Sequence, residues 1–165
     1  MTTFNLPSDV EAVFHQFPHC EFATLGKDGT PIAWPTCPLY LPETGRFLIT
    51  ASIGWPQKAF NVRRNPHVSL LFSDPSGSKL SHPPAVLVQG DANIPHEVVT
   101  WNDDLERLWS LLYQRRPAEG SAVIPSSMDW FYMRLLIYIT PQRIRWWPDG
   151  NFERIAQEIE VSHVG

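Results

Sequence analysis

Two hydroxyl residues and a lysine stand where an apolar strand gives way to a helix, and together they could bind a phosphate group. Thr50 and Ser52 end the strand, and Lys58 follows in the first turns of a helix that begins near Pro56. Backbone amides at a helix start attract anions, and hydroxyl and ammonium donors add to that attraction. The same arrangement is common in proteins that bind no ligand, so a purely structural role stays open at this point.

The other reactive side chains form no pattern that predicts a metal site or a catalytic nucleophile. The 6 histidines lack metal-ligand spacing, and no Ser-His-Asp or Cys-His arrangement can be argued. Cys20 and Cys37 are too few for a disulfide framework, and they indicate two buried thiols in a reducing cytoplasm. His163, close to the C-terminus, is one candidate ligand for a heme iron.

Four helices are expected in the chain. Ser8 and Glu11 have the spacing of a capping box, with Ser8 as the N-cap, and apolar residues follow at helical intervals as far as Phe17. Pro56 suits the first turn of the second helix, because it has no N–H group that would need a partner there. The helices are expected over residues 8–17, 56–64, 97–116 and 152–159.

Seven strands are expected, most of them joined by hairpins. Asp28-Gly29 is a strong hairpin signal, whereas Pro35 and Pro38 cannot donate ladder hydrogen bonds and so predict an irregular or edge strand. Gly90 inside a strand indicates a β-bulge. The strands are expected over residues 20–25, 31–41, 46–51, 67–73, 85–94, 133–139 and 143–147.

The composition is that of one folded domain over residues 1–165. Hydrophobic residues make up 43% of the chain, which is enough for a packed core, and 16 prolines disfavour a long helical bundle. Helices are inserted between hairpin-linked strands rather than alternating with them, so a parallel sheet is not expected. The fold class predicted is mainly β, a small antiparallel Greek-key barrel with peripheral helices.

Charge and hydropathy exclude several classes of partner. The formal charge of −4 excludes a generally basic nucleic-acid binder, and the longest apolar run is far shorter than the roughly 20 residues of a membrane span. The N-terminus lacks the features of a signal peptide, so a cytoplasmic location is expected. Only 18% of residues are charged, against about 25% on average, which suggests that a second subunit covers part of the surface.

The segment 45–72 resembles the flavin-binding core of the pyridoxamine 5′-phosphate oxidase-like split-barrel superfamily. Its upstream hairpin, residues 23–36, and a late segment, residues 139–150, also resemble that family, so the resemblance covers about residues 8–150. It implies an antiparallel Greek-key split β-barrel. Within the central segment the residues that carry it are Gly45, the apolar residues 47–49, Thr50, Lys58, Asn65-Pro66 and the apolar strand 68–72.

The resemblance implies an FMN cofactor bound at the interface of a homodimer. Carried over by position, Thr50 and Ser52 would bind the phosphate or the ribityl chain, and Lys58, helped by Gln57, would pair with the phosphate. Charge-assisted hydrogen bonds of this kind hold a dianionic phosphate strongly.

Two further positions complete the site that the resemblance implies. Ile49 would contact the isoalloxazine ring through its backbone, and Trp147 would reach the flavin from the other subunit. The function implied is a flavin-dependent oxidoreductase acting on a small-molecule redox substrate. A deazaflavin-dependent reductase on the same fold, or a non-catalytic flavin or heme binder, is the alternative.

The sequence departs from true pyridoxamine phosphate oxidases at two places. Those enzymes carry an Arg and a Lys on the second strand, where this chain has Trp34 and Leu39. They also end in an Arg-Leu-His-Asp-Arg run that binds substrate, whereas the corresponding segment here is residues 151–155, Asn-Phe-Glu-Arg-Ile. We therefore expect no oxidation of pyridoxamine phosphate.

Overall fold

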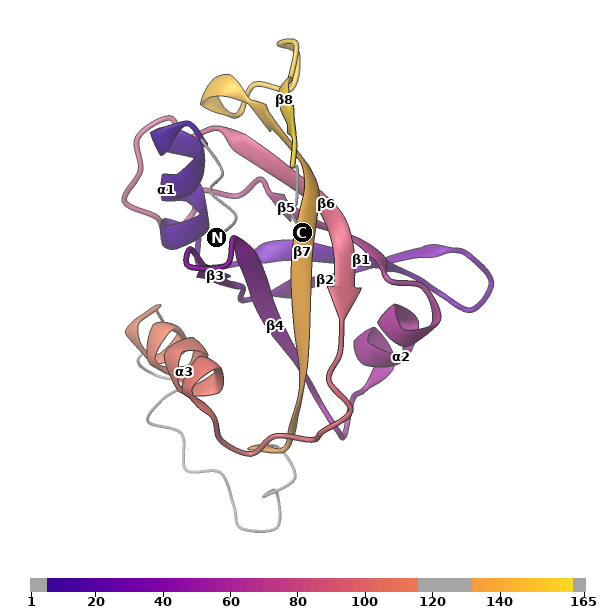
Figure 1. Cartoon of the computed structure of the whole chain (residues 1–165). Helices are drawn as coiled ribbons and strands as arrows, with labels where there is room; N and C mark the ends of the chain where they lie inside the picture. Colours follow the sequence, from indigo (N-terminus) through magenta and orange to yellow (C-terminus); the bar gives the residue numbers. More distant parts are fainter. Residues whose placement is uncertain (1–5, 116–131, 162–165) are drawn as a thin grey trace.

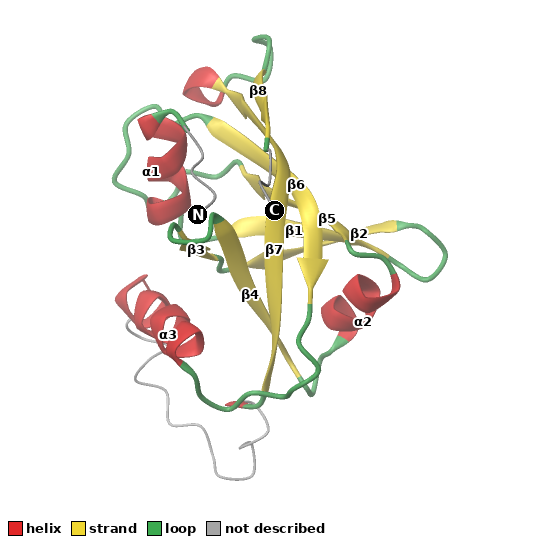
Figure 2. Cartoon of the chain, viewed as in Figure 1, coloured by secondary structure: helices red, strands yellow, loops and turns green. Residues whose placement is uncertain are grey.

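The computed structural model describes residues 6–115 and 132–161. There, eight strands form one antiparallel sheet that curls into a half-barrel with helices around it, which confirms the predicted split-barrel fold class (Figures 1 and 2). The elements are α1 (Ser8–Gln16), β1 (Cys20–Leu25), β2 (Pro31–Thr36), β3 (Leu39–Leu41), β4 (Arg46–Ser52), α2 (Gln57–Arg64), β5 (His67–Phe72), β6 (Ala85–Asn93), α3 (Asp103–Arg115), β7 (Arg134–Trp147), the 3-10 turn η2 (Pro148–Gly150) and β8 (Gln157–Glu160).

The strand order is β2-β1-β5-β6-β7-β4-β3, and β8 pairs with β7 outside that path. The prediction of one strand over residues 31–41 is wrong, because the chain breaks at residues 37–38 into β2 and β3. Pro38 lies in the break, where the missing N–H group does not interrupt a ladder. The two pieces lie at opposite edges of the sheet, so the expected edge position is confirmed for both.

Two apolar clusters hold the fold together. The larger fills the barrel and takes alternate residues of the long strands, such as Phe47 and Ile49 of β4, together with the apolar face of α1. The smaller lies on the outer side of β4 and β7, where Leu48 and Leu136 pack against Leu105 of α3. Side chains alternate across a strand, so the outer side of β4 carries Leu48 first and then Thr50 and Ser52.

The expected bulge at Gly90 is confirmed, and it explains why the predicted pair of late strands is a single strand. The β6–β7 register shifts between Gln89 and Gly90, and Gly90 lies opposite Pro141. A Cβ atom on Gly90 would stand 2.1 Å from the carbonyl oxygen of Thr140. Glycine thus lets β7 continue through Pro141, where a break was expected.

The long helix begins later than its apolar pattern predicts. Instead of residues 97–116, α3 spans Asp103–Arg115, and the N–H group of Leu105 donates to Oδ1 of Asn102 at 2.8 Å. Upstream, Val99 exchanges two backbone hydrogen bonds of 2.8 Å with Arg134, so this segment is recruited to the sheet edge. Tertiary pairing has overridden a helical periodicity that looked continuous in sequence.

Both chain ends also differ from expectation. Ser8 is the first residue of α1 rather than its cap; Pro7 occupies the N-cap position with no side-chain hydrogen bond. The helix expected over residues 152–159 is wrong, because residues 157–160 form β8. Arg145 of β7 pairs with Glu158 across this ladder, and such cross-strand pairs favour a strand over an isolated helical turn.

Candidate functional site

The candidate site begins where β4 extends past its neighbour β3. The β3–β4 pairing ends at Leu39 opposite Leu48, so Ile49 to Ser52 pair with β7 alone. Ile49 is fully buried with its side chain in the barrel core, which leaves its backbone as the part that could contact a ligand. Thr50 is half buried and Ser52 is 6% exposed.

A short turn carries the chain from Ser52 into α2. The Ser52 hydroxyl oxygen accepts a hydrogen bond from the N–H group of Gly54 at 3.2 Å, and its carbonyl accepts one from Trp55 at 3.0 Å. The N–H group of Ile53 donates to the carbonyl of Met133 at 3.3 Å, which ties the turn to the start of β7. Trp55 is 64% exposed at the tip.

Helix α2 is fixed to the barrel by a buried amide that sequence reasoning missed. Nδ2 of Asn61 donates to the Thr24 hydroxyl of β1 at 2.9 Å, and Asn61 is fully buried. The exposed Gln57 donates from Nε2 to Oδ1 of Asn61 at 2.9 Å. A polar residue on the inner face of an otherwise apolar helix stripe was the available signal for Asn61.

Lys58 is the second residue of α2, and its side chain is half buried. Burial and, second, the nearby charge of Arg134 lower the pKa of Lys58 below its usual range, whereas Cys20 acts in the opposite direction. Among the residues that the structure describes, Lys58 forms no ion pair with a carboxylate. A partly desolvated ammonium without a carboxylate partner is suited to bind an anionic group.

Arg134 is the second residue that sequence reasoning missed. The β4–β7 register places Arg134 directly opposite Ser52, and only 8% of its surface is exposed. Its guanidinium carbon lies 5.1 Å from the centre of the Trp109 ring of α3, within cation–π range. Desolvation lowers the pKa of Arg134 from its usual value. The one available signal was an arginine directly before the apolar run of residues 135–139.

Trp147 lies far from these residues within one chain. Thr50 pairs with Leu136 near the start of β7, whereas Trp147 ends that strand opposite Ala85. The centre of the Trp147 ring lies 5.1 Å from the centre of the Phe152 ring. At about 3.3 Å per residue, the path from Leu136 to Trp147 along the strand is roughly 35 Å. Only the turn over residues 53–56 separates Thr50 and Ser52 of β4 from Lys58 of α2, whereas Trp147 lies at the far end of β7.

Trp34 and Leu39 stand where the oxidases carry an Arg and a Lys, and both lie in apolar surroundings. Trp34 packs against the barrel core, and Leu39 is 8% exposed within the cluster under α3. In the segment after β7, Arg154 pairs with Asp149 at 2.9 Å.

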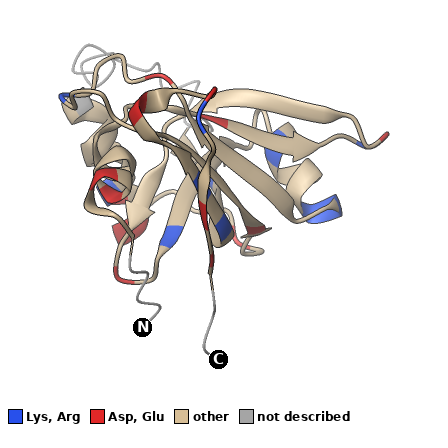
Figure 3. Cartoon of the chain, turned by 90° about the horizontal axis from the view of Figure 1, so that it is seen from above, with Lys and Arg blue, Asp and Glu red and all other residues tan. Residues whose placement is uncertain are grey.

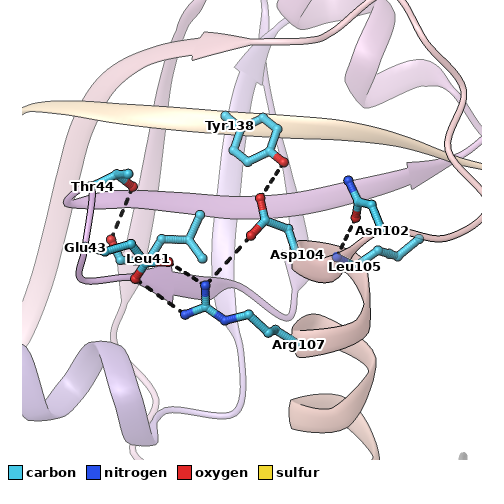
Figure 4. Close-up of polar contacts among 8 residues, drawn as sticks. All are labelled: Leu41, Glu43, Thr44, Asn102, Asp104, Leu105, Arg107 and Tyr138. Atoms are coloured by element: carbon cyan, nitrogen blue, oxygen red, sulfur yellow. Dashed lines mark hydrogen bonds and ion pairs between the residues drawn. The ribbon is translucent and has the colours of Figure 1, made fainter.

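Helix α3 is anchored beside the site by a polar network (Figure 4). The Tyr138 hydroxyl of β7 donates to Oδ2 of Asp104 at 2.7 Å, and Arg107 of α3 pairs with Glu43 in the turn between β3 and β4. The guanidinium of Arg46 lies 4.9 Å from the Tyr138 ring centre. Burial, followed by the hydrogen bond to Asp104, raises the pKa of Tyr138 to about 12.

Residues 6–115 and 132–161 were also searched for a metal site, a membrane-spanning helix and a basic surface. No cluster of three metal-ligating side chains occurs there, and none of the helices there is long and apolar enough to cross a membrane. Basic positions are separated by acidic and uncharged segments in Figure 3. His163, the heme-ligand candidate, lies outside the described residues. Cys20 is buried as expected, and Cys37 is half buried.

One cavity lies elsewhere on the molecule. It measures about 810 Å³ and runs between α1, α3 and the loop after β5, with His15, His19 and Lys79 in its lining. Its lining includes none of Thr50, Ser52 or Lys58.

A family model described as pyridoxamine 5′-phosphate oxidase matches residues 6–148 of the chain. The chain belongs to this family. No curated protein sequence matches the chain significantly.

Solved structures share the fold of this pyridoxamine 5′-phosphate oxidase family member at low sequence identity. A heme binding protein from Mycobacterium smegmatis is 19% identical with a TM-score of 0.59, and the alignment covers 95% of this chain but only 60% of that one. A putative pyridoxamine 5′-phosphate oxidase from Listeria innocua is 22% identical with a TM-score of 0.54, covering 83% and 94%. A structure named F420 reductase is 21% identical with a TM-score of 0.60, covering 84% and 98%.

Proposed function

We propose that this chain is a flavoprotein that binds FMN at the end of β4 and the start of α2, and that it works as an oxidoreductase on a small-molecule redox substrate. The bound site is completed by a second copy of the chain in a homodimer. Membership of the pyridoxamine 5′-phosphate oxidase family supports the class of cofactor.

The observation that carries the proposal is the state of Lys58. This ammonium group is half buried, its pKa is lowered by burial and by Arg134, and among the described residues it forms no ion pair. The hydroxyl-bearing Thr50 and Ser52 and the first turn of α2 lie in the same corner. A dianionic phosphate fits this set, because it supplies the missing counter-charge and accepts from each donor.

Each residue of the site has a separate task in this proposal. Lys58 and the α2 amides hold the phosphate, Thr50 and Ser52 donate to the phosphate or the ribityl chain, and the Ile49 backbone at the open edge of β4 lies against the ring. Gln57, held by Asn61, lines the mouth of the site. FMN, when bound, supplies hydride or electron transfer, while the protein orients the ring and excludes water.

Two other cofactors are alternatives because fold neighbours are named for them. One neighbour is called a heme binding protein and another an F420 reductase. The absorption spectrum of the purified protein separates the three, since oxidised FMN gives flavin bands, a deazaflavin absorbs at shorter wavelength, and heme gives a Soret band. A Soret band alone would contradict the FMN assignment.

The sharpest test of the proposal is Lys58→Ala, titrated with FMN and with riboflavin. A charge-assisted contact to phosphate is worth roughly 1.5–3 kcal/mol, so FMN affinity should fall by about one to two decades. Riboflavin lacks the phosphate and should lose little. The measurement is flavin fluorescence, with Lys27→Ala in the β1–β2 turn, an exposed lysine, as the matched control. Equal losses for the two ligands, or no loss for either, would remove the phosphate from this corner.

A further inference from the structure

A network of polar side chains runs along one face of α2, where Gln57, Asn61 and Arg64 follow one another at helical spacing. Nε2 of Gln57 donates to Oδ1 of Asn61 at 2.9 Å, and Nδ2 of Asn61 donates to the hydroxyl oxygen of Thr24 in β1 at 2.9 Å. Nη1 and Nη2 of Arg64 lie 3.5 Å and 3.4 Å from the same Oδ1 atom. Because Asn61 is fully buried and Thr24 is 2% exposed, the network is anchored inside the protein.

Arg64 fixes the direction in which these hydrogen bonds run. A guanidinium group donates hydrogen bonds and accepts none, so the atom of Asn61 that faces it must be the amide oxygen and not the nitrogen. The Thr24 hydroxyl both donates and accepts, and it therefore suits the nitrogen of Asn61 on the other side. With the oxygen of Asn61 turned towards Gln57 as well, Gln57 can join the network only as a donor, through Nε2.

The carboxamide oxygen of Gln57 is the part of this side chain that remains for a ligand. Within the part of the chain that the structure describes, no hydrogen bond reaches Oε1 of Gln57, and the side chain is exposed. Gln57 and Lys58 are the first two residues of α2, at the corner where the phosphate is proposed to bind. A phosphate dianion has no hydrogen to donate to an amide oxygen, whereas a hydroxyl group has one.

We propose that Arg64 and Asn61 are positioning residues that hold the Gln57 oxygen towards the cofactor, where it accepts a hydrogen bond from a ribityl hydroxyl group of the flavin. This inference rests on the proposed function, and it replaces the expected contact of Gln57 with the phosphate. Lys58 binds the phosphate, and Gln57 binds the polyhydroxyl segment that joins the phosphate to the ring. Two neighbouring residues of α2 thus recognise two different parts of one cofactor.

Three flavins separate these contacts in fluorescence titrations of the full-length protein. FMN has the ribityl segment and the phosphate, riboflavin has the ribityl segment alone, and lumiflavin has a methyl group in place of both. Gln57→Leu removes the acceptor and keeps a good helix former. Gln16→Leu, at an exposed glutamine of α1, is the matched control, and circular dichroism checks that each variant is folded.

Arg64→Met tests the positioning step, and the preceding residue supplies its control. Arg63 and Arg64 are both exposed in the last turn of α2 and carry the same charge, but of the two it is Arg64 that contacts Asn61. Arg63→Met therefore measures any general effect of charge on flavin binding. The Gln57→Leu/Arg64→Met double variant completes a double-mutant cycle.

Gln57→Leu should weaken FMN and riboflavin binding by the same factor, about 3- to 10-fold, as expected for the loss of one neutral hydrogen bond. Lumiflavin affinity should change by less than about twofold, because that ligand lacks the ribityl hydroxyls. Arg64→Met should weaken riboflavin binding about two- to fivefold, whereas Arg63→Met should leave it unchanged. The double variant should bind riboflavin as Gln57→Leu does, because Arg64 acts through Gln57.

Several results would overturn the inference. If Gln57→Leu weakens FMN but not riboflavin, Gln57 contacts the phosphate instead. Equal losses for all three flavins, or no loss for any, also refute the ribityl contact, while a selective loss of FMN in Lys58→Ala keeps the proposed function. Equal effects of Arg64→Met and Arg63→Met on riboflavin refute the positioning role. A wild-type protein that binds none of the three flavins contradicts the proposed function and, with it, this inference.

Discussion

Lys58 shows a conflict between stability and binding at the scale of a single residue. Its side chain is partly buried, burial lowers its pKa, and it forms no ion pair among the described residues. An apolar side chain of similar length avoids the cost of removing an ammonium group from water. Under the proposed function, the lysine that strengthens binding of a phosphate therefore weakens the ligand-free protein.

Lys58→Met tests that conflict in the ligand-free protein. The variant should melt about 2–4 °C higher at pH 7, which corresponds to roughly 1 kcal/mol for a chain of this size. Differential scanning calorimetry of both apo proteins measures it. The same variant should bind FMN more weakly than wild type, so the two effects have opposite signs.

The pH dependence of this difference follows from the lowered pKa of Lys58. A lysine whose pKa is lower folded than unfolded disfavours folding at any pH where it must stay charged, and the penalty fades as pH rises through the folded pKa towards 10.5. The melting advantage of Lys58→Met should therefore shrink between neutral pH and that upper limit. An advantage that grows with pH would contradict the assignment.

At the scale of elements, the long strand β7 determines where the site can form. It pairs with β4 over residues 134–139 and with β6 over residues 138–147, so one strand positions Arg134 opposite Ser52 and carries Trp147 to its other end. Its continuity depends on the close approach of Gly90 to Pro141. A substitution where Gly90 lies against Pro141 should therefore disturb the β6–β7 pairing and the position of both ends of β7.

Gly90→Ala is expected to destabilise the barrel. The new Cβ atom would stand 2.1 Å from the Thr140 oxygen and 2.9 Å from the Pro141 Cα atom, and both are backbone atoms that cannot swing aside. Overpacking of this kind costs about 1–3 kcal/mol, and chemical denaturation should show it. Gln89→Ala, at the exposed neighbouring position, should change the unfolding free energy by less than about 0.5 kcal/mol. Equal stability of the two variants would mean that the bulge relaxes freely.

At the scale of the whole molecule, the separation of Trp147 from Lys58 requires a second chain if both contact one flavin. Light scattering at micromolar concentration should give a dimer mass, and a monomer would exclude the composite site. The low fraction of charged residues, 18%, also favours a dimer, because a second subunit would cover part of a weakly charged surface.

A mixing experiment tests the composite site directly. Lys58→Ala and Trp147→Ala homodimers should each bind FMN weakly, whereas subunit exchange between them creates dimers with one unaltered site. Random exchange should restore about a quarter of the wild-type sites, because half of the dimers are mixed and each carries one intact site. No recovery after verified exchange would place both residues in the same chain's site or Trp147 in none.

Pyridoxamine phosphate should not be a substrate of the flavin-loaded protein. In the segment where the oxidases carry their substrate-binding run, Arg154 pairs with Asp149, and the chain then continues into β8. Pyridoxal phosphate formation, followed by its absorbance, should stay at the level of free FMN. Efficient turnover would show that another part of the chain replaces that run.

Local sequence signals determined those parts of this protein that depend on neighbours along the chain. The Asp28-Gly29 hairpin, the Pro56 helix start and the strand-turn-helix around Lys58 are formed by residues adjacent in sequence, so their types alone identify them. The Gly90 bulge belongs with them, since a glycine inside a strand pattern is itself a local signal of a bulge. The phosphate-binding role of Thr50, Ser52 and Lys58 stays a prediction.

Tertiary structure decided what depends on pairing between distant segments. Val99 left a helical pattern to pair with Arg134, residues 157–160 became a strand because Arg145 faces them, and β7 ran through Pro141 because Gly90 made room. Arg134 joined the candidate site only through the β4–β7 register, which no local pattern encodes. Cross-strand partners are set by the burial of both faces at once, and that balance exists only when the whole sheet has closed.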